Sequence, residues 1–372
     1  MKFQTTRNNL LDTALFVNKM INPKISSPIL NGMMIDVGKE LTLYSTDLET
    51  SIKSTVPVVV YEEGKAVVLS KIFINILKSL KESKVDIEFD KLANQIKISC
   101  GNALFTLNTL PAGEFPSFPE IKKEKQIKIN IDKFKDLVLK VQKAASIDES
   151  RTVLTGIFFN IEDGVFNMVA TDSYRLALVK NEIGEKSSTI GVTVPAKVLD
   201  SIAKSEYRGS DININIEENQ ISFYPVENEQ SGQGKDVIVT RLLSGKFPDY
   251  KQLLPDRLKH EIAIDRNKML DVVRRITSIS QDSVPVKLTI DSGRISVSMS
   301  IREIGSSSED FEIPYEGERI EISFNPEFLM DGLNIMDCDK IIMSIDEPLK
   351  PITIKPEKKD NPIYLLMPMR VV

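Results

Sequence analysis

The chain repeats one order of motifs three times, at intervals of about 125 to 135 residues. The run ILNGMMI at 29–35 returns at 153–159 as VLTGIFF, and each run is followed at the same interval by Thr-Asp, at 46–47 and 171–172. A repeat this long is a complete small domain and is too large to be one unit of a solenoid. The sequence therefore predicts three tandem copies of one fold, with a function that uses a surface created by the repetition.

A second motif marks the end of the first two copies. LPAGEFPSF at 110–118 returns at 242–250 as LLSGKFPDY. Charged, turn-prone segments follow near 122–126 and 256–259, where neighbouring copies are expected to separate. The predicted domains are residues 1–124, 125–257 and 258–372.

Each copy is expected to contain two helices. The short second helices have start signals, with Ser70 and Asn325 as capping residues and Pro195 or Pro326 in the first turn. In the first helices apolar residues recur every three or four positions, which indicates one buried face. These faces consist of Leu10, Leu11, Ala14, Val17 and Ile21, of Phe134, Leu137, Val138, Val141 and Ala145, and of Met269, Val272, Val273 and Ile276.

Strands fill the rest of each copy. Apolar residues alternate with Asp, Glu or Asn at 85–90 and 211–216, and turn residues at 94–95 and 218–219 return the chain as further strands. Such a copy is two helices laid on one face of an antiparallel sheet. The predicted fold class is α+β, built from three copies of this domain.

Composition narrows the class of protein without identifying it. The 372 residues are 41% hydrophobic and 27% charged, which suits two or three separate cores. No apolar run is long enough to cross a membrane, and the polar sequence after Met1 is unlike a signal peptide. Cys100 and Cys338 each stand alone, which argues against a disulfide framework or a thiolate metal site and suits a reducing cytoplasm.

Catalytic motifs are scarce. The one histidine, His260, falls in a predicted linker, where solvent exposure is the favoured interpretation over general-base chemistry. Neither a phosphate-binding GxxxxGK[ST] nor a dinucleotide-binding GxGxxG is present. The acidic groups 337–339 and 47–49 are better explained as a helix end and a turn than as metal ligands. We therefore expect no catalytic residues, no cofactor and no metal.

The distribution of charge along the chain is more informative about possible binding surfaces than the net charge. The chain has a formal net charge of −5, yet the six predicted helical segments total +6. Five of these segments are basic, whereas the last, 327–337, carries −3. Basic helices in an acidic protein suit a surface that touches phosphates, although a solvated lysine face explains them equally well. The acidic segment fits neither interpretation.

Three motifs in order resemble one family. ATDSYRLA at 170–177, LLSGKFPDYKQLLP at 242–255 and YLLMPMR at 364–370 are similar to the beta subunit of bacterial DNA polymerase III, and the resemblance extends over the whole chain. It implies a non-catalytic DNA sliding clamp in which two chains join head to tail as a ring. Helices would line a hole around duplex DNA, sheets would form the outer wall, and sliding would need no contact to bases.

The resemblance also implies a peptide-binding pocket between the second and third copies. Polymerases and repair factors would insert a short linear motif there, and the apolar run at 365–369 with its adaptable methionines supports such a role. Ser173-Tyr174 and Gln252 depart from the family pattern and should change motif preference. The implied pocket residues are Leu154, Thr171, Ser173, Tyr174, Arg175, Leu176, Pro248, Leu253, Asn325, Phe328, Leu365, Leu366, Met367, Pro368, Met369 and Arg370.

Two further surfaces follow from the resemblance. The residues expected to face DNA are Lys24, Lys71, Lys78, Arg151 and Lys197, although Asp148 and Glu149 dilute the potential beside Arg151. The ring interface should join edge strands of the first and third copies, with Phe105, Leu107 and Ile279 as candidates. Ordinary core packing is the alternative role for each of these three.

The expected partners are duplex DNA bound without sequence preference, a second copy of the chain, the polymerase alpha subunit, the clamp loader, and other polymerases and repair proteins. No membrane partner is expected, and the expected location is the cytoplasm, at the nucleoid. A scaffold that binds only proteins is the main alternative, and it would need no inward positive charge. A catalytic function would require a site that the sequence does not offer.

Overall fold

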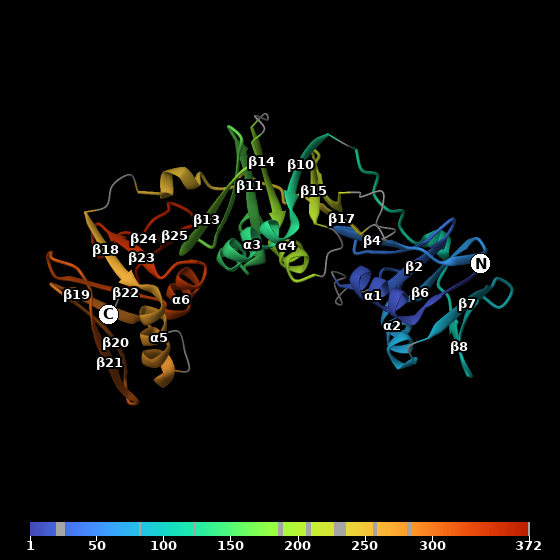
Figure 1. The fold of residues 1–372 in the computed structure, drawn as a ribbon, viewed down its shortest axis with the longest axis horizontal. Coiled ribbons are helices and arrows are strands. Elements are labelled where there is room, and N and C mark those ends of the chain that lie inside the picture. Colours follow the sequence, from blue (N-terminus) through green and yellow to red (C-terminus); the bar gives the residue numbers. More distant parts are fainter. Residues whose placement is uncertain are drawn as a thin grey trace. The chain divides into compact units, whose positions relative to one another are not determined.

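The computed structural model describes residues 1–19, 27–81, 83–122, 124–184, 189–205, 210–226, 236–255, 259–280 and 284–370. The chain forms two compact units. The first unit consists of Met1–Lys135 and Lys197–Leu242, and the second of Asp136–Ala196 and Leu243–Val372. Each unit contains one antiparallel sheet of eight strands and a smaller antiparallel sheet, so the α+β class is confirmed (Figure 1).

In the first unit the smaller sheet has five strands. Its order is β5 (Val59–Glu62), β1 (Lys2–Thr6), β7 (Lys84–Asp90), β8 (Gln95–Cys100) and β9 (Ala103–Asn108). The larger sheet has the order β10 (Lys125–Asn130), β15 (Asp211–Ile216), β16 (Gln220–Pro225), β17 (Asp236–Arg241), β4 (Thr50–Val56), β3 (Leu41–Thr46), β2 (Gly32–Val37) and β6 (Gly64–Leu69). Because β17 of the second copy pairs with β4 of the first, this sheet continues across two repeats.

The second unit repeats this plan with later parts of the chain. Its eight-stranded sheet has the order β14 (Ile190–Pro195), β11 (Gly156–Glu162), β12 (Val165–Thr171), β13 (Arg175–Glu182), β25 (Ile363–Leu366), β24 (Ile352–Pro356), β23 (Lys340–Ile345) and β18 (His260–Asp265). The four-stranded sheet has the order β21 (Gly305–Glu312), β20 (Arg294–Ile301), β19 (Val286–Asp291) and β22 (Ile320–Phe324). Here β13 of the second copy pairs with β25 of the third.

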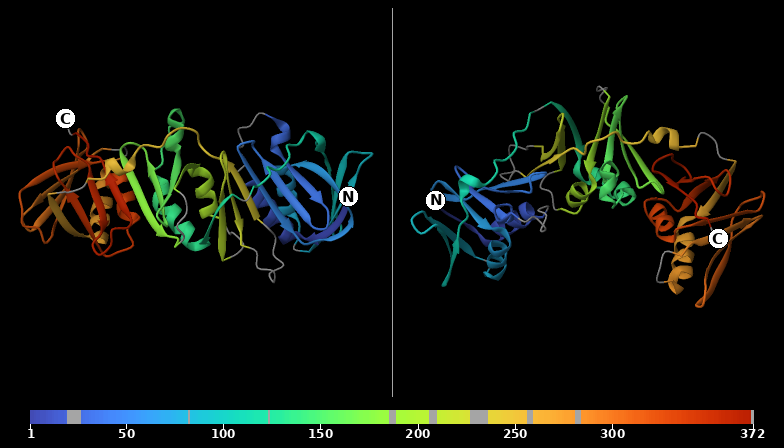
Figure 2. Two further views of the ribbon diagram at one scale, coloured as in Figure 1. Left: turned by 90° about the horizontal axis from the view of Figure 1, so that it is seen from above. Right: turned by 180° about the vertical axis from the view of Figure 1, so that it is seen from behind.

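Helices lie in pairs within the units. In the first unit α1 (Arg7–Asn18) contacts α2 (Ser70–Ser79), and in the second α5 (Arg266–Ile276) contacts α6 (Pro326–Asn334), as Figures 1 and 2 show. The helices α3 (Ile131–Val141) and α4 (Ala196–Ala203) each contain one of the points at which the chain passes between units. Among the described residues, no helix is both long enough and apolar enough to span a membrane.

The predicted apolar faces are confirmed as core. All their members within the described helices are buried, with relative exposures of 7% or less. Helix α1 packs against β3 and β4, and α5 packs against β20 and β21. Two members lie elsewhere. Ala145 follows the short 3₁₀ turn at Gln142–Ala144 and is half-buried, because α3 ends at Val141, and Ile21 lies outside the described residues.

The helix start signals are only partly right. Asn325 caps α6, its side-chain oxygen accepting the N–H groups of Glu327 and Phe328 at 2.9 and 3.3 Å. The prediction that Ser70 caps α2 is wrong, because Ser70 is the first helical residue and Leu69 holds the cap position. The Ser70 hydroxyl is instead buried without a hydrogen-bond partner in the described structure. Pro195 ends β14 and immediately precedes α4.

Candidate functional site

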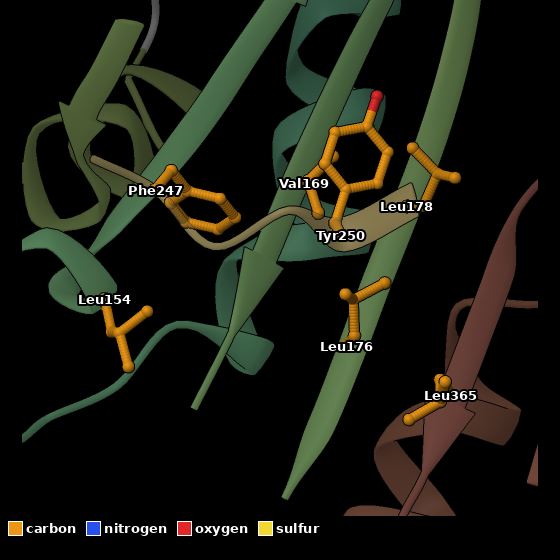
Figure 3. Close-up of a cluster of buried hydrophobic side chains, with 7 residues drawn as sticks. All are labelled: Leu154, Val169, Leu176, Leu178, Phe247, Tyr250 and Leu365. Carbon is orange, nitrogen blue, oxygen red and sulfur yellow. The ribbon is translucent and has the colours of Figure 1, made fainter. Parts of the chain in front are cut away.

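A cluster of buried apolar side chains lies where β13 pairs with β25 (Figure 3). Leu176 of β13 stands opposite Leu365 of β25 in the strand register, so the second and third copies contribute to one core. We call this place the strand junction. The buried cluster consists of Leu154, Val169, Leu176, Leu178, Phe247, Tyr250 and Leu365.

The repeated motif at 242–250 supplies the aromatic part of this cluster. The Phe247 ring stacks on Phe158, with ring centroids 4.8 Å apart and an interplanar angle of 5°. The Tyr250 hydroxyl accepts a hydrogen bond of 3.0 Å from the side-chain amide of Asn160. In the first copy the matching motif buries Phe115 in a separate apolar cluster. The motif therefore fixes a connecting segment onto the sheet in both copies.

Several large apolar side chains remain exposed around the buried cluster. Relative exposure is 62% for Tyr174, 47% for Leu253, and 37% each for Met367 and Met369. The backbone N–H of Met367 donates to the Tyr174 carbonyl at 2.9 Å, and that of Met369 donates to Ser323 O at 2.7 Å. Exposed apolar groups gathered on an anchored segment are typical of a protein-interaction surface.

The Thr-Asp motif builds the turn that carries Tyr174. The Asp172 carboxylate accepts the N–H groups of Tyr174 and Arg175, each at 2.9 Å, while Ser173 adopts a left-handed φ of 79°. In the first copy Asp47 makes the same kind of turn, with its carboxylate accepting the N–H of Thr50 at 2.7 Å. The repeated motif is therefore a local device for making this turn, and the exposed side chain at its tip is free to differ between copies.

Behind the turn lies a buried ion-pair network centred on Arg175. Its guanidinium contacts Asp172 Oδ2 at 3.0 Å and Asp331 Oδ2 at 2.7 Å, and lies 4.0 Å from the ring centroid of Phe328. Burial alone would lower the pKa of Arg175, but the Tyr364 hydroxyl and the two carboxylates outweigh it and raise the pKa. Arg175 is thus a permanent cation held between two acids and one aromatic face.

Tyr364 completes the packing between β25 and α6. Its hydroxyl donates to Phe328 O at 2.9 Å, and burial raises the pKa of the phenol, so the group stays neutral. The Tyr364 ring packs directly on Gly332 of α6, where an added Cβ would lie 2.5 Å from the Cδ1 atom of the ring. Close contact between strand and helix therefore depends on glycine at this position.

We expect Gly332→Ala to lower stability although alanine is the better helix former. Helix propensity would favour alanine by about 1 kcal/mol, but the clash with Tyr364 should cost about 1–3 kcal/mol through forced repacking. Chemical denaturation of the variant should show a lower midpoint than wild type. Asn334→Ala, at an exposed position of the same helix, is the control and should be neutral or slightly stabilising.

The predicted pocket residues fall into three groups by exposure. The buried members, which form the floor and the strand pairing, are Leu154, Thr171, Arg175, Leu176, Leu365 and Leu366. The half-buried members are Asn325, Phe328 and Pro368. The exposed members are Ser173, Tyr174, Pro248, Leu253, Met367, Met369 and Arg370. All of them belong to the second unit, and the contacts given above join about half of them.

Arg151 lies in a different environment from the other predicted DNA-facing residues. Its guanidinium pairs with Asp148 at 3.0 Å and donates to the Asp172 carbonyl at 3.3 Å and to Ser173 Oγ at 3.2 Å. It therefore supports the turn beside the strand junction, and the acid that was expected to dilute its charge is its partner. Asp331 and Lys143 belong to the Arg175 network, and neither of them was identified from the sequence as a site residue. The acidic composition of 327–337 was the one signal that could have indicated Asp331.

The remaining DNA-facing candidates lie on helix surfaces. Lys71 and Lys78 are exposed on α2, and Lys197 is exposed on α4. Lys24 lies outside the described residues.

The interface candidates have different positions. Phe105 and Leu107 are half-buried on β9, which is an edge strand as predicted. Ile279 is not on a strand, because the chain after α5 forms a 3₁₀ turn at Thr277–Ile279; the edge strand beside that turn is β21.

The prediction for His260 is wrong. It begins strand β18, opposite Ile345, and its Nδ1 atom lies 3.1 Å from the Tyr315 hydroxyl, so it is a half-buried structural residue and not part of a linker. The Tyr315 hydroxyl also donates to Glu318 O at 2.9 Å. Within the described residues, no group of three or more His, Cys, Asp or Glu is arranged to hold a metal ion.

Known proteins resemble the whole chain. The N-terminal, central and C-terminal domain models of the DNA polymerase III beta subunit match residues 1–119, 128–249 and 251–370. The beta sliding clamp of Staphylococcus epidermidis is 28% identical, with 100% of this chain and 99% of the relative covered. Among solved structures, the sliding clamp of Bacillus subtilis is 28% identical with a TM-score of 0.93, and the beta subunit of Pseudomonas aeruginosa is 25% identical with a TM-score of 0.91; both cover 100% of each chain.

These matches follow the repeat seen in the sequence, one domain model for each copy. They confirm three tandem clamp domains and a sliding-clamp function without catalysis. The chain belongs to the DNA polymerase III beta subunit family, the bacterial DNA sliding clamps.

Proposed function

We propose that two copies of this chain close head to tail into a ring that encircles duplex DNA and tethers the replicative polymerase to it. The observation that carries the proposal is the match of all three copies, in order, to the three domains of one clamp subunit. A ring of this kind holds DNA by topology, so it needs no recognition of bases and leaves the protein free to slide.

Two free sheet edges support the head-to-tail contact. The five-stranded sheet ends at β9, and the four-stranded sheet ends at β21. Exposed strand edges invite pairing with another chain, and a contact between two different edges closes into a ring when the rotation permits. We propose that β9 with Phe105 and Leu107 meets β21, with Ile279 beside it, on the partner copy.

Exposed lysines on α2 and α4 support contact with DNA. Lys71, Lys78 and Lys197 stand on the outer faces of amphipathic helices whose apolar faces are buried in the core. We propose that they, together with Lys24, act as non-specific phosphate neighbours. Arg151 is a weaker member of this set, since its charge is already paired with Asp148.

The strand junction is the proposed docking site for partner proteins. Its exposed apolar side chains surround a rigid, hydrogen-bonded turn, an arrangement suited to a short peptide with bulky apolar residues. We propose that the predicted pocket residues form this site. We propose that the proteins that bind there are the polymerase alpha subunit, the clamp loader, and other polymerases and repair proteins. The proposed location is the nucleoid, in the cytoplasm.

We also propose that the three copies are separated at the limits 1–124, 125–257 and 258–372.

Retention on circular DNA tests the function directly. Wild-type protein loaded onto a nicked plasmid by the clamp loader should stay bound during gel filtration at salt that releases non-specific binders, because the link is topological. Cutting the plasmid once should release it. A protein that leaves intact circles as fast as linear DNA would favour the protein-binding scaffold instead.

Reversal of charge on α2 should weaken DNA binding without regard to sequence. We expect Lys71→Glu with Lys78→Glu to reduce direct binding to duplex DNA by about tenfold at moderate salt and to lower the salt dependence by about one unit for each lysine that contacts a phosphate. Fluorescence anisotropy at several salt concentrations measures both quantities. Lys91→Glu with Lys358→Glu, at two exposed turn positions, is the charge-matched control and should bind as wild type.

A further inference from the structure

Two acids of the segment 327–337 form ion pairs with lysines of the second copy. Asp331 Oδ1 lies 2.7 Å from Lys143 Nζ, and Asp337 Oδ2 lies 2.6 Å from Lys140 Nζ. Both lysines come from the second copy, whereas both acids belong to the third. Two of the three acids that make this segment anomalous among basic helices therefore serve contacts between copies within the second unit.

Asp331 differs from Asp337 in its burial and in a second ion pair. It is 8% exposed, and its other oxygen, Oδ2, contacts the Arg175 guanidinium at 2.7 Å. The Asp337 side chain is 71% exposed and pairs with Lys140, whose pKa rises because its hydrogen bonds to Asp337 and Asp136 outweigh its burial. Buried charges act strongly on their neighbours, whereas exposed pairs contribute little. Only the Asp331 contact leads into the strand junction.

A continuous series of contacts runs from Asp331 to the proposed peptide surface. Asp331 holds one end of Arg175 and Asp172 holds the other, so the guanidinium is fixed against the Phe328 ring. Asp172 in turn accepts the N–H of Tyr174, whose carbonyl accepts the N–H of Met367. Phe328 and Tyr174 are thus both positioned by groups that share Arg175.

We propose that Asp331 is a positioning residue of the peptide site: it orients Arg175 so that Phe328 and the turn at 172–174 are held in the arrangement that accepts an apolar peptide. The proposal rests on the proposed docking function of the strand junction. Lys143 supports Asp331 from the solvent side, since its exposed ammonium pairs with the carboxylate oxygen that Arg175 does not contact.

Asp331→Asn tests the proposal with little change of shape. The variant keeps one acceptor but loses the charge, so Arg175 should no longer be fixed against Phe328. We expect a fluorescein-labelled peptide from the polymerase alpha subunit to bind about tenfold more weakly, the size of one charge-assisted hydrogen bond. The matched control Asp337→Asn removes an acid of the same segment that also pairs with a lysine of the second copy, and it should change affinity less than twofold.

A spectroscopic measurement separates positioning from general destabilisation. The chain contains no tryptophan, so Phe328→Trp introduces a single fluorescent reporter next to Arg175. Adding Asp331→Asn should shift its emission in the absence of any peptide, because the stacked cation moves, whereas adding Asp337→Asn should not. Both measurements are made below the thermal midpoint of each variant, determined by circular dichroism.

The outcomes distinguish the two levels of proposal. Wild-type affinity in folded Asp331→Asn, or an unchanged emission, would overturn the role of Asp331 while leaving the docking function intact. Failure of the wild-type protein to bind the peptide would overturn the docking function, and the emission change would still decide whether Asp331 orients Arg175. If Asp331→Asn does not fold, Lys143→Met replaces it: binding two- to threefold weaker supports the proposal, and unchanged binding overturns it.

Discussion

Removal of residues 367–372 should abolish binding of a polymerase-derived peptide while leaving a folded dimer. The deleted segment carries the exposed side chains of Met367 and Met369 and the two backbone hydrogen bonds that hold it against Tyr174 and Ser323. Strand β25, which ends at Leu366, keeps its pairing with β13. Because a few central apolar anchors carry most of the energy of such an interface, we expect at least about 100-fold weaker binding.

The truncation is best measured against a shorter one. Fluorescence anisotropy with the labelled peptide gives affinity, and sedimentation gives the mass of the protein. Deleting only residues 371–372 should have little effect on either quantity, since the anchors remain. Full affinity in the folded six-residue truncation would show that the peptide docks somewhere other than the strand junction.

Phe105→Arg should convert the proposed dimer into monomers. Phe105 is half-buried on the edge strand β9, and in the proposed ring a partner edge would cover it fully. An arginine there would be buried without a counter-charge, which costs about 3–5 kcal/mol and exceeds what a modest interface can absorb. The fold of the isolated chain should survive, because an exposed edge of a monomer can accommodate the longer side chain in water.

Sedimentation equilibrium at micromolar protein is the appropriate measurement for this variant. Wild type should sediment at twice the monomer mass of 41.8 kDa, and Phe105→Arg near that monomer mass. The control is Leu92→Arg, which places the same residue in a turn where the leucine is 99% exposed. A Phe105→Arg protein that remains dimeric would place the contact between copies away from β9.

Features that depend on neighbouring residues could be predicted from the sequence. The apolar period of Met269, Val272, Val273 and Ile276 identified the buried face of α5, because burial follows helical geometry. Asn325 and Pro326 identified the start of α6 for the same local reason. The three-fold repeat then gave the fold class, since each motif reinforced the assignment of its counterpart in the next copy.

Features that depend on residues far apart in the chain could not be predicted. Lys143 and Asp331 are separated by 188 positions, and no local pattern indicates that they form an ion pair. They meet in the same unit in which β13 pairs with β25, where α6 of the third copy lies beside the 3₁₀ turn at Gln142–Ala144 of the second. The prediction that Ser70 caps α2 was wrong for a different reason, because the helix begins one residue earlier than expected. At the first helical position the Ser70 hydroxyl is buried and does not cap the helix.

The position of β25 in the chain also has a consequence for synthesis. Strand β13 ends at Glu182, whereas its neighbour β25 begins at Ile363. During translation the second copy must therefore wait for about 180 further residues before that edge is covered. Until then the nascent chain presents the unpaired edge of β13, the strand that carries Leu176 and Leu178. We expect chaperones that bind exposed strands to engage the growing polypeptide in this interval, and to release it once Leu366 has left the ribosome.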